Sequence, residues 1–205
     1  MVLACVALSS FVLTHSDDDP AVQVVYEPII QTAPVMTHAE RSNRIRSAIL
    51  SLAERHRVTG DRERLNLLAD TIYRESLQND IDPLLVAAII SMESSFRPAV
   101  VSEAGAVGLM QLRPFVAQDL AQRSALEWNG VETRHAPQLN VRLGILYYKE
   151  LLHRFEGDPE IALTADLFGP TRVRRQIARG TYRGSSYADD ILDLYSALST
   201  RRAGA

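Results

Sequence analysis

Residues 82–111 constrain the fold and the chemistry of this chain more than any other stretch. Asp82 followed by Pro83 is a helix start signal, because aspartate caps free N–H groups and proline fits the first helical position. The apolar run that follows predicts a helix over about residues 84–92, with one acidic residue, Glu93, near its C-terminal end. The first prediction is therefore an apolar helix that delivers a single carboxyl at its end.

The spacing around Glu93 makes this carboxyl unusual. Val86, Ile90 and Glu93 are related as i, i+4 and i+7, so Glu93 continues an apolar stripe instead of lying on a polar face. A carboxyl at the edge of such a stripe is partly desolvated, which raises its pKa. A general acid that works near neutral pH needs this property. The alternative interpretation is a buried helix that tolerates one glutamate.

A loop rich in small residues follows the helix. Pro98 is expected to end the helix, and residues 102–108 contain two glycines three positions apart, which permit positive φ and close approach of a ligand to the backbone. Residues 109–111 add an apolar surface and an amide, and Pro114 is placed to start the next helix. An acid, a glycine loop and an amide in this order predict one wall of a cleft for a polar polymer.

The motif Glu93-Ser94-Ser95-Phe96, followed by Ser102 and by Gly-Ala-Val-Gly-Leu-Met-Gln at 105–111, resembles the signature of SLT-type lytic transglycosylases. These are goose-lysozyme-like enzymes that cleave bacterial peptidoglycan. The resemblance covers roughly residues 65–197 and implies a mainly α, lysozyme-like α+β fold with a single compact catalytic domain. It implies that Glu93 is catalytic. It also implies substrate-binding or groove-shaping roles for Ser94, Ser102, Gly108, Met110, Gln111 and Tyr187, and Asp166 occupies a further substrate-binding position of the family.

The resemblance also implies a reaction. Glu93 would protonate the leaving oxygen of the β-1,4 bond between N-acetylmuramic acid and N-acetylglucosamine, and would then act as a base toward the 6-hydroxyl group. The product would be a 1,6-anhydromuramoyl end, formed without a cofactor or a metal. One carboxyl can serve both steps.

Residues 165–170 depart from the family pattern Ala-Tyr-Asn-x-Gly-Pro. Asp166 stands where the family has Tyr, and Leu167 stands where it has Asn. We expect Asp166 to point to solvent and the site to be weakened. If Asp166 instead lies near Glu93, it would raise the pKa of Glu93 and permit a lysozyme-like hydrolysis. A third hypothesis is a module that binds peptidoglycan without cutting it.

Length and composition predict one main core. The 205 residues are 46% hydrophobic, enough for a single substantial domain. We expect an apolar, signal- or anchor-like segment with a flexible linker at 1–40, an accessory helix at 41–60 and the lysozyme-like domain at 61–200. Asn140 is expected to cap a later helix in which Gly144 allows close packing, and another helix is expected to run through residues 160–173.

Charge and cysteine content limit the partners. A net charge of −3 and a pI near 6.0 do not indicate a nucleic-acid binder, and the single cysteine, Cys5, excludes a cysteine-based zinc site. We expect export to the periplasm or cell envelope, membrane association through residues 1–13, and peptidoglycan strands as the substrate. A role beside a secretion or motility apparatus is compatible with this. An arginine-rich segment over 172–183 predicts either contact with peptide carboxylates or a solvated helix face.

Overall fold

The computed structural model describes residues 37–58, 61–127 and 136–203, with side chains described to residue 200. Within these residues it is mainly α, as predicted, and its β-structure is limited to isolated bridges that Val107 makes with Val101 and Leu112. Residues 1–36 of the segment predicted at 1–40 lie outside the described residues. The helices are α1 (His38–Arg55), α2 (Arg62–Gln78), α3 (Pro83–Ser94), α4 (Pro114–Arg123), α6 (Pro137–Arg154), α7 (Pro159–Phe168), α8 (Pro170–Ala178) and α9 (Ser186–Ala203).

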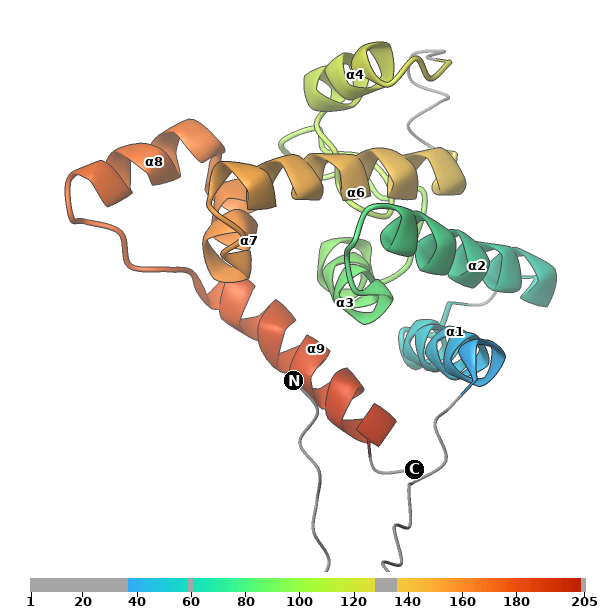
Figure 1. The fold of residues 1–205 in the computed structure, drawn as a ribbon. Coiled ribbons are helices and arrows are strands. Elements are labelled where there is room, and N and C mark those ends of the chain that lie inside the picture. The colour runs from blue at the N-terminus through green and yellow to red at the C-terminus, as the bar shows by residue number, and fades with distance from the viewer. Residues whose placement is uncertain (1–36, 59–60, 128–135, 204–205) are drawn as a thin grey trace, which may run out of the picture. The chain divides into compact units, whose positions relative to one another are not determined.

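The helix α3 is the centre of the domain. It packs against α1, α2 and α9, and Figure 1 shows it between them. Every residue from Pro83 to Ser91 is buried, so this helix has no solvent-facing side over most of its length. A helix that is apolar all round is stable in water only when other helices cover it. The rest of the fold supplies that cover.

Three helices begin with an aspartate cap, which the sequence analysis predicted for the helix that Asp82 starts. The carboxylate of Asp82 accepts a hydrogen bond from the Leu84 N–H at 2.8 Å, and Asp61 and Asp158 cap α2 and α7 in the same way. The helix predicted over about residues 84–92 is confirmed, but Pro98 does not end it, because α3 stops at Ser94. Ser95 and the residue after it adopt left-handed φ values of 51° and 60°, which turn the chain directly behind Glu93.

The predicted accessory helix is α1. Its apolar residues Ile45, Ile49 and Leu52 are buried in the core, as their spacing of four and three predicted. At the end of α1 the His56 ring nitrogen Nε2 lies 2.6 Å from the Ser91 hydroxyl of α3. This contact and the apolar packing fix α1 to the helix that carries Glu93.

Asn140 does not cap its helix, contrary to the sequence-based prediction. The helix α6 begins three residues earlier, at Pro137, so Asn140 lies within it and its side chain points to the loop before α4. The Asn140 carbonyl accepts the Met110 N–H at 2.8 Å, and its amide donates to the Val107 carbonyl at 2.9 Å. A side-chain amide thus completes the backbone hydrogen bonding of a buried loop. One turn further on, a Cβ on Gly144 would lie 2.7 Å from Met110 Cβ, so Gly144 permits this close approach, as predicted.

We expect Asn140→Ala to lower the free energy of unfolding by about 1–3 kcal/mol, because it leaves the Met110 N–H buried without a partner. It also removes one of the two hydrogen bonds that the Val107 carbonyl accepts, the other being from the Leu112 N–H. Urea unfolding followed by circular dichroism measures this. The matched control is Asn66→Ala on an exposed position of α2, where the change should be within about 0.5 kcal/mol. Equal stability of the two variants would contradict the role of Asn140.

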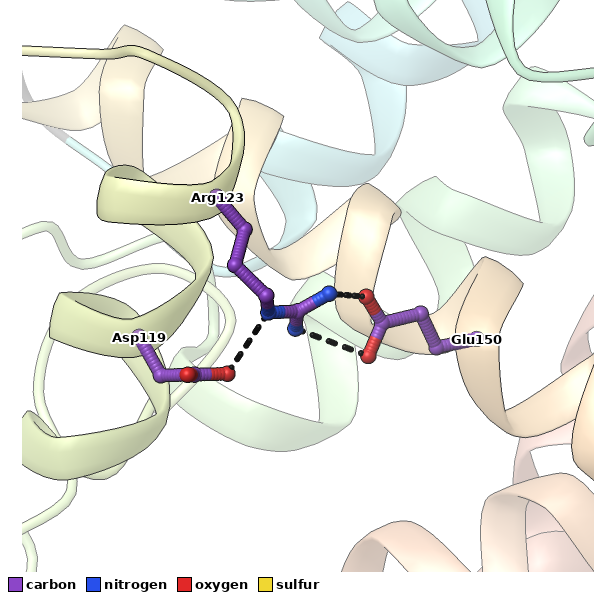
Figure 2. Close-up of polar contacts among 3 residues, drawn as sticks. All are labelled: Asp119, Arg123 and Glu150. Carbon is purple, nitrogen blue, oxygen red and sulfur yellow. Dashed lines mark hydrogen bonds and ion pairs between the residues drawn. The ribbon is translucent and has the colours of Figure 1, made fainter.

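The helix α4 is tied to α6 by a charged bridge at the surface. The Arg123 guanidinium contacts Glu150 of α6 through two hydrogen bonds of 2.6 and 3.1 Å, and Asp119 of α4 through one of 2.9 Å (Figure 2). The three side chains are exposed, so this bridge fixes geometry more than it stabilises the fold. Beneath it, Leu120 of α4 and Leu143 of α6 are buried in a small satellite core.

The single helix predicted over residues 160–173 is interrupted. The chain forms α7 up to Phe168, turns at Gly169 with φ of 89°, and resumes as α8 at Pro170. Glycine adopts this φ without strain, and proline has no N–H to continue the α7 hydrogen bonds but fits the first position of a new helix. The Gly-Pro pair therefore changes the direction of the chain between α7 and α8. Figure 1 shows α8 at the edge of the domain.

Candidate active site

Glu93 lies in the last turn of α3, where the buried helix reaches the surface. Its side chain is half-buried, and the Tyr187 hydroxyl of α9 donates a hydrogen bond to its Oε1 atom. Burial raises the pKa of Glu93 above its ordinary value, and the hydrogen bond from Tyr187 partly opposes this. The raised pKa predicted from the apolar stripe is therefore confirmed.

The side chain of Asp166, on α7, lies near Glu93 and Tyr187. Burial raises the pKa of Asp166 to about 7, the charge of Glu93 contributes to the rise, and Tyr187 and Arg113 oppose it. The side chain is only partly exposed. The prediction that Asp166 points to solvent is therefore wrong. The reason is that the last turn of α7 packs toward α9, so position 166 faces Tyr187 and Glu93.

Tyr187 connects the two carboxyls. It lies in the first turn of α9, and the charges of both Asp166 and Glu93 add to the effect of burial in raising the pKa of its phenol far above the ordinary value. A phenol that stays protonated remains a hydrogen-bond donor throughout the working pH range. The structure thus brings together Glu93, Asp166 and Tyr187, three of the residues that the sequence singled out.

Hydrogen bonds join the segments that carry Asp166 and Tyr187. The sequence analysis did not identify the residues that form them. The buried Thr164 hydroxyl lies 2.9 Å from the Ser185 hydroxyl, and each residue precedes its site residue by two positions. Ser185 also accepts the Ala188 N–H at 3.2 Å, which caps α9. Tyr182 reaches Thr164 at 3.2 Å from the connecting loop. These short polar residues form no recognisable sequence motif, because their partners lie about 20 positions away.

The residues predicted to line the groove lie in the loop behind Glu93 and mostly serve its internal structure. The Ser102 hydroxyl accepts the Ala106 N–H at 3.0 Å. The Gln111 amide donates to the carbonyls of Val100 at 3.1 Å and Gly108 at 2.8 Å. These bonds hold the loop in one shape, and the predicted contacts of Ser102 and Gln111 with a substrate stay a prediction.

Ser94, Gly108 and Met110 are buried. The Ser94 hydroxyl donates to the Ile90 carbonyl at 3.2 Å, which occupies it inside α3. Met110 packs on Gly144. These three residues therefore support the site from beneath rather than present groups at its surface.

Two tyrosines of α6 lie near the carboxyl pair. Burial raises the pKa of Tyr147 and of Tyr148, and the charge of Asp166 adds to both. The Tyr148 hydroxyl is buried and has no hydrogen-bond partner among the described residues. No group of three or more His, Cys, Asp or Glu side chains in the described part of the chain is placed to hold a metal ion.

One surface hollow lies away from these residues. A hollow of about 200 Å³ is lined by Arg44, Arg55, Leu84 and Leu198, between α1, α3 and α9. Leu84 is at the start of α3 and Glu93 is at its end, about 14 Å further along a helix that rises 1.5 Å per residue. The site is therefore defined by its carboxyls and tyrosine and not by this hollow.

Across residues 70–187 the chain matches the family model described as "Transglycosylase SLT domain". A "Transglycosylase" of Enterobacteria phage PRD1 is 38% identical over 96 residues, which are 47% of this chain and 32% of that protein. An "Endo-type membrane-bound lytic murein transglycosylase A" of Klebsiella pneumoniae is 44% identical over 71 residues, 33% of this chain and 34% of the relative. The chain therefore spans about a third of the length of these curated relatives.

Solved structures show the same fold. The 70-kDa soluble lytic transglycosylase SLT70 of Escherichia coli superposes with a TM-score of 0.59 at 23% identity, over 66% of this chain and 24% of that protein. The lytic transglycosylase Slt of Pseudomonas aeruginosa gives the same TM-score at 24% identity, over 65% of this chain and 24% of that one. The family match includes Glu93, Asp166 and Tyr187 and covers more than half of the chain, which therefore belongs to the Transglycosylase SLT domain family.

Proposed function

We propose that this domain is a lytic transglycosylase that cleaves the β-1,4 bond between N-acetylmuramic acid and N-acetylglucosamine in peptidoglycan. The observation that carries the proposal is the half-buried Glu93, with its raised pKa and its hydrogen bond from Tyr187. A carboxyl that keeps its proton toward neutral pH is suited to protonate a leaving oxygen. The relatives named as murein transglycosylases support the choice of substrate.

In the proposed reaction Glu93 acts first as an acid and then as a base. Its proton passes to the glycosidic oxygen while the bond from that oxygen to the anomeric carbon breaks, with the electron pair leaving on the oxygen. The substrate's own acetamido group stabilises the cationic centre. The 6-hydroxyl oxygen then bonds to the anomeric carbon, and its proton returns to Glu93. Tyr187 orients the carboxyl through both steps.

Asp166 supports a second candidate function, which is lysozyme-like hydrolysis. A second carboxyl beside the acid could take a proton from water in place of the 6-hydroxyl group. The rise in the pKa of Asp166 to about 7 works against this, because a general base must be ionised. We therefore place hydrolysis second.

The proposed substrate also indicates where the protein works. Peptidoglycan lies outside the cytoplasm, so we propose a location in the periplasm or cell envelope, where local opening of the wall could serve a secretion or motility apparatus. Curated relatives described as membrane-bound are consistent with this location. None of the helices in the described part of the chain is both long and apolar enough to cross a membrane.

The test is the mass of the products released from intact sacculi. Transglycosylation leaves 1,6-anhydromuramoyl ends, which are lighter by one water than the reducing ends left by hydrolysis. We expect anhydro products from the full chain. Reducing ends would favour the second candidate, and the absence of products with retained binding to sacculi would leave a peptidoglycan-binding module.

A further inference from the structure

The charge of the chain is unevenly distributed. Residues 167–188 contain five arginines and no acidic residue, although the whole chain carries −3, so the remaining residues carry −8. This segment comprises α8 and its connection to α9. A local excess of +5 on an acidic protein creates a surface field that attracts anions. The arginines are Arg172, Arg174, Arg175, Arg179 and Arg183.

Three of these arginines form a stripe on the outer face of α8, which we call the arginine stripe. Arg172 and Arg175 lie in α8, and Arg179 is its C-cap residue. The three are related as i, i+3 and i+7, which places them along one side, and all three are exposed. Val173 lies on the other side and is fully buried, where α8 packs against α7. Val173 is therefore used within the protein, Ile177 one turn further on is 41% exposed, and the outer side of α8 presents guanidinium groups.

The guanidinium groups of the segment are largely unused. Among the described residues none of the five arginines forms an ion pair; Arg172 lies 4.9 Å from the centre of the Phe168 ring, and Arg183 donates to the Tyr182 carbonyl at 2.9 Å. The contrast is Arg123, which is held between two carboxylates (Figure 2). The planar N–H groups of Arg175 and Arg179 thus remain open to a partner, and they match carboxylates in geometry.

The segments on either side of α8 in the sequence carry residues of the candidate active site. Asp166 lies in the last turn of α7, four residues before Pro170 begins α8, and Tyr187 lies just after the loop that leaves α8. The helix α8 also packs against α7, which carries Asp166, so a long ligand held at Glu93 and Asp166 has α8 on the α7 side of the site. A carboxylate-bearing branch on such a ligand would meet an open guanidinium surface there.

We propose that the arginine stripe binds the carboxylates of the short peptides attached to the glycan strand. This inference rests on the proposed function, because it takes peptidoglycan as the ligand at Glu93. A membrane surface fits less well. A helix that lies in a bilayer interface buries an apolar face in the lipid, and α8 is a nine-residue helix whose Val173 face is already covered by α7.

The test compares Arg175→Gln/Arg179→Gln with the control Arg41→Gln/Arg64→Gln, which also removes two exposed charges. Both pairs are made in a Glu93→Gln background, and binding of soluble glycan strands is measured with and without enzymatic removal of their peptides. We expect the stripe variant to bind peptide-bearing strands about 3- to 10-fold more weakly than the control at low salt, and equally well at 1 M salt. The stripe variant and the control should bind strands without peptides (stripped strands) with equal affinity.

Each other outcome has a definite meaning. Equal binding of peptide-bearing strands by the two variants overturns the proposal, and so does an equal loss on stripped strands, which would assign the stripe to sugar recognition. If the stripe variant binds only phosphatidylglycerol vesicles more weakly than the control does, the arginine stripe is a membrane-binding surface and the proposal fails. If the unmodified protein forms no products but the peptide-dependent loss remains, cleavage fails as the function and the stripe proposal stands. If no strand binds to any variant, both fail.

Discussion

Replacing Glu93 by Gln is expected to lower the rate of peptidoglycan cleavage by about 10²- to 10⁴-fold. The amide keeps the size of the side chain and can still accept the hydrogen bond from Tyr187, but it can neither give up a proton to the leaving oxygen nor take one from the 6-hydroxyl group. Both proposed steps fail together, so no other group restores the rate. The measurement is the release of soluble muropeptides from sacculi over time.

The matched control is Glu103→Gln, which removes an exposed carboxyl from the loop that follows the same helix. Its rate should stay within about twofold of the parent. The Glu93→Gln protein should fold as well as the parent, because a partly buried carboxyl is replaced by a neutral amide that needs less solvation. Cleavage by Glu93→Gln at the parent rate would rule out Glu93 as the acid and would leave only a structural role for it.

Local signals in the sequence predicted the helix framework and the place of the acid. Asp82, Asp61 and Asp158 each start a helix through a contact of two or three residues in range, which sequence spacing reports directly. The burial of Glu93 followed from the same periodicity, because position 93 lies on the stripe that contains the fully buried Val86 and Ile90. These features depend on neighbours along the chain.

The errors arose where long-range contacts decide the outcome. Asn140 is a good capping residue, yet it bonds with Met110 and Val107 some 30 residues away, and no local pattern distinguishes the two uses. The orientation of Asp166 depends on how α7 meets α9. The Thr164–Ser185 contact joins residues 21 positions apart. Tertiary contacts therefore determine side-chain partners and orientations that the local sequence does not determine.

The second large effect concerns the electrostatic coupling of Glu93 and Asp166. The pKa of Asp166 is raised to about 7 by burial and by the charge of Glu93, and burial raises that of Glu93. Two interacting carboxyls lose their protons in steps that belong to the pair, so the proton lost near pH 7 is the last proton of the pair. Activity that needs this proton should decline as the pH rises through 7.

Asp166→Asn is expected to move this alkaline decline to lower pH. The charge of Glu93 raises the pKa of Asp166, and such coupling is reciprocal, so an ionised Asp166 must hold the proton on Glu93 to higher pH. The variant lacks this charge, and Glu93 releases its proton earlier. At pH 5 the variant should stay within a few-fold of the parent, and at pH 8 it should be about tenfold slower, because the protonated fraction falls tenfold for each pH unit above the pKa. Initial rates of muropeptide release between pH 4.5 and 8.5 measure the two profiles. Asp189→Asn, an exposed change of the same charge on α9, should leave the profile unchanged.

The pH dependence of stability gives a second measurement that does not require activity. A carboxyl whose pKa is about 7 when folded and near 4 when unfolded binds more protons in the folded state between these values. The free energy of unfolding must therefore fall as the pH rises from about 4 to 7, by on the order of 2 kcal/mol for a partly exposed group, and level off above 7. Asp166→Asn should show a smaller decline, because only the raised pKa of Glu93 remains, whereas Asp189→Asn should retain the full decline. Parallel unfolding curves for the two variants across this range would mean that Asp166 is solvated and does not share a proton with Glu93.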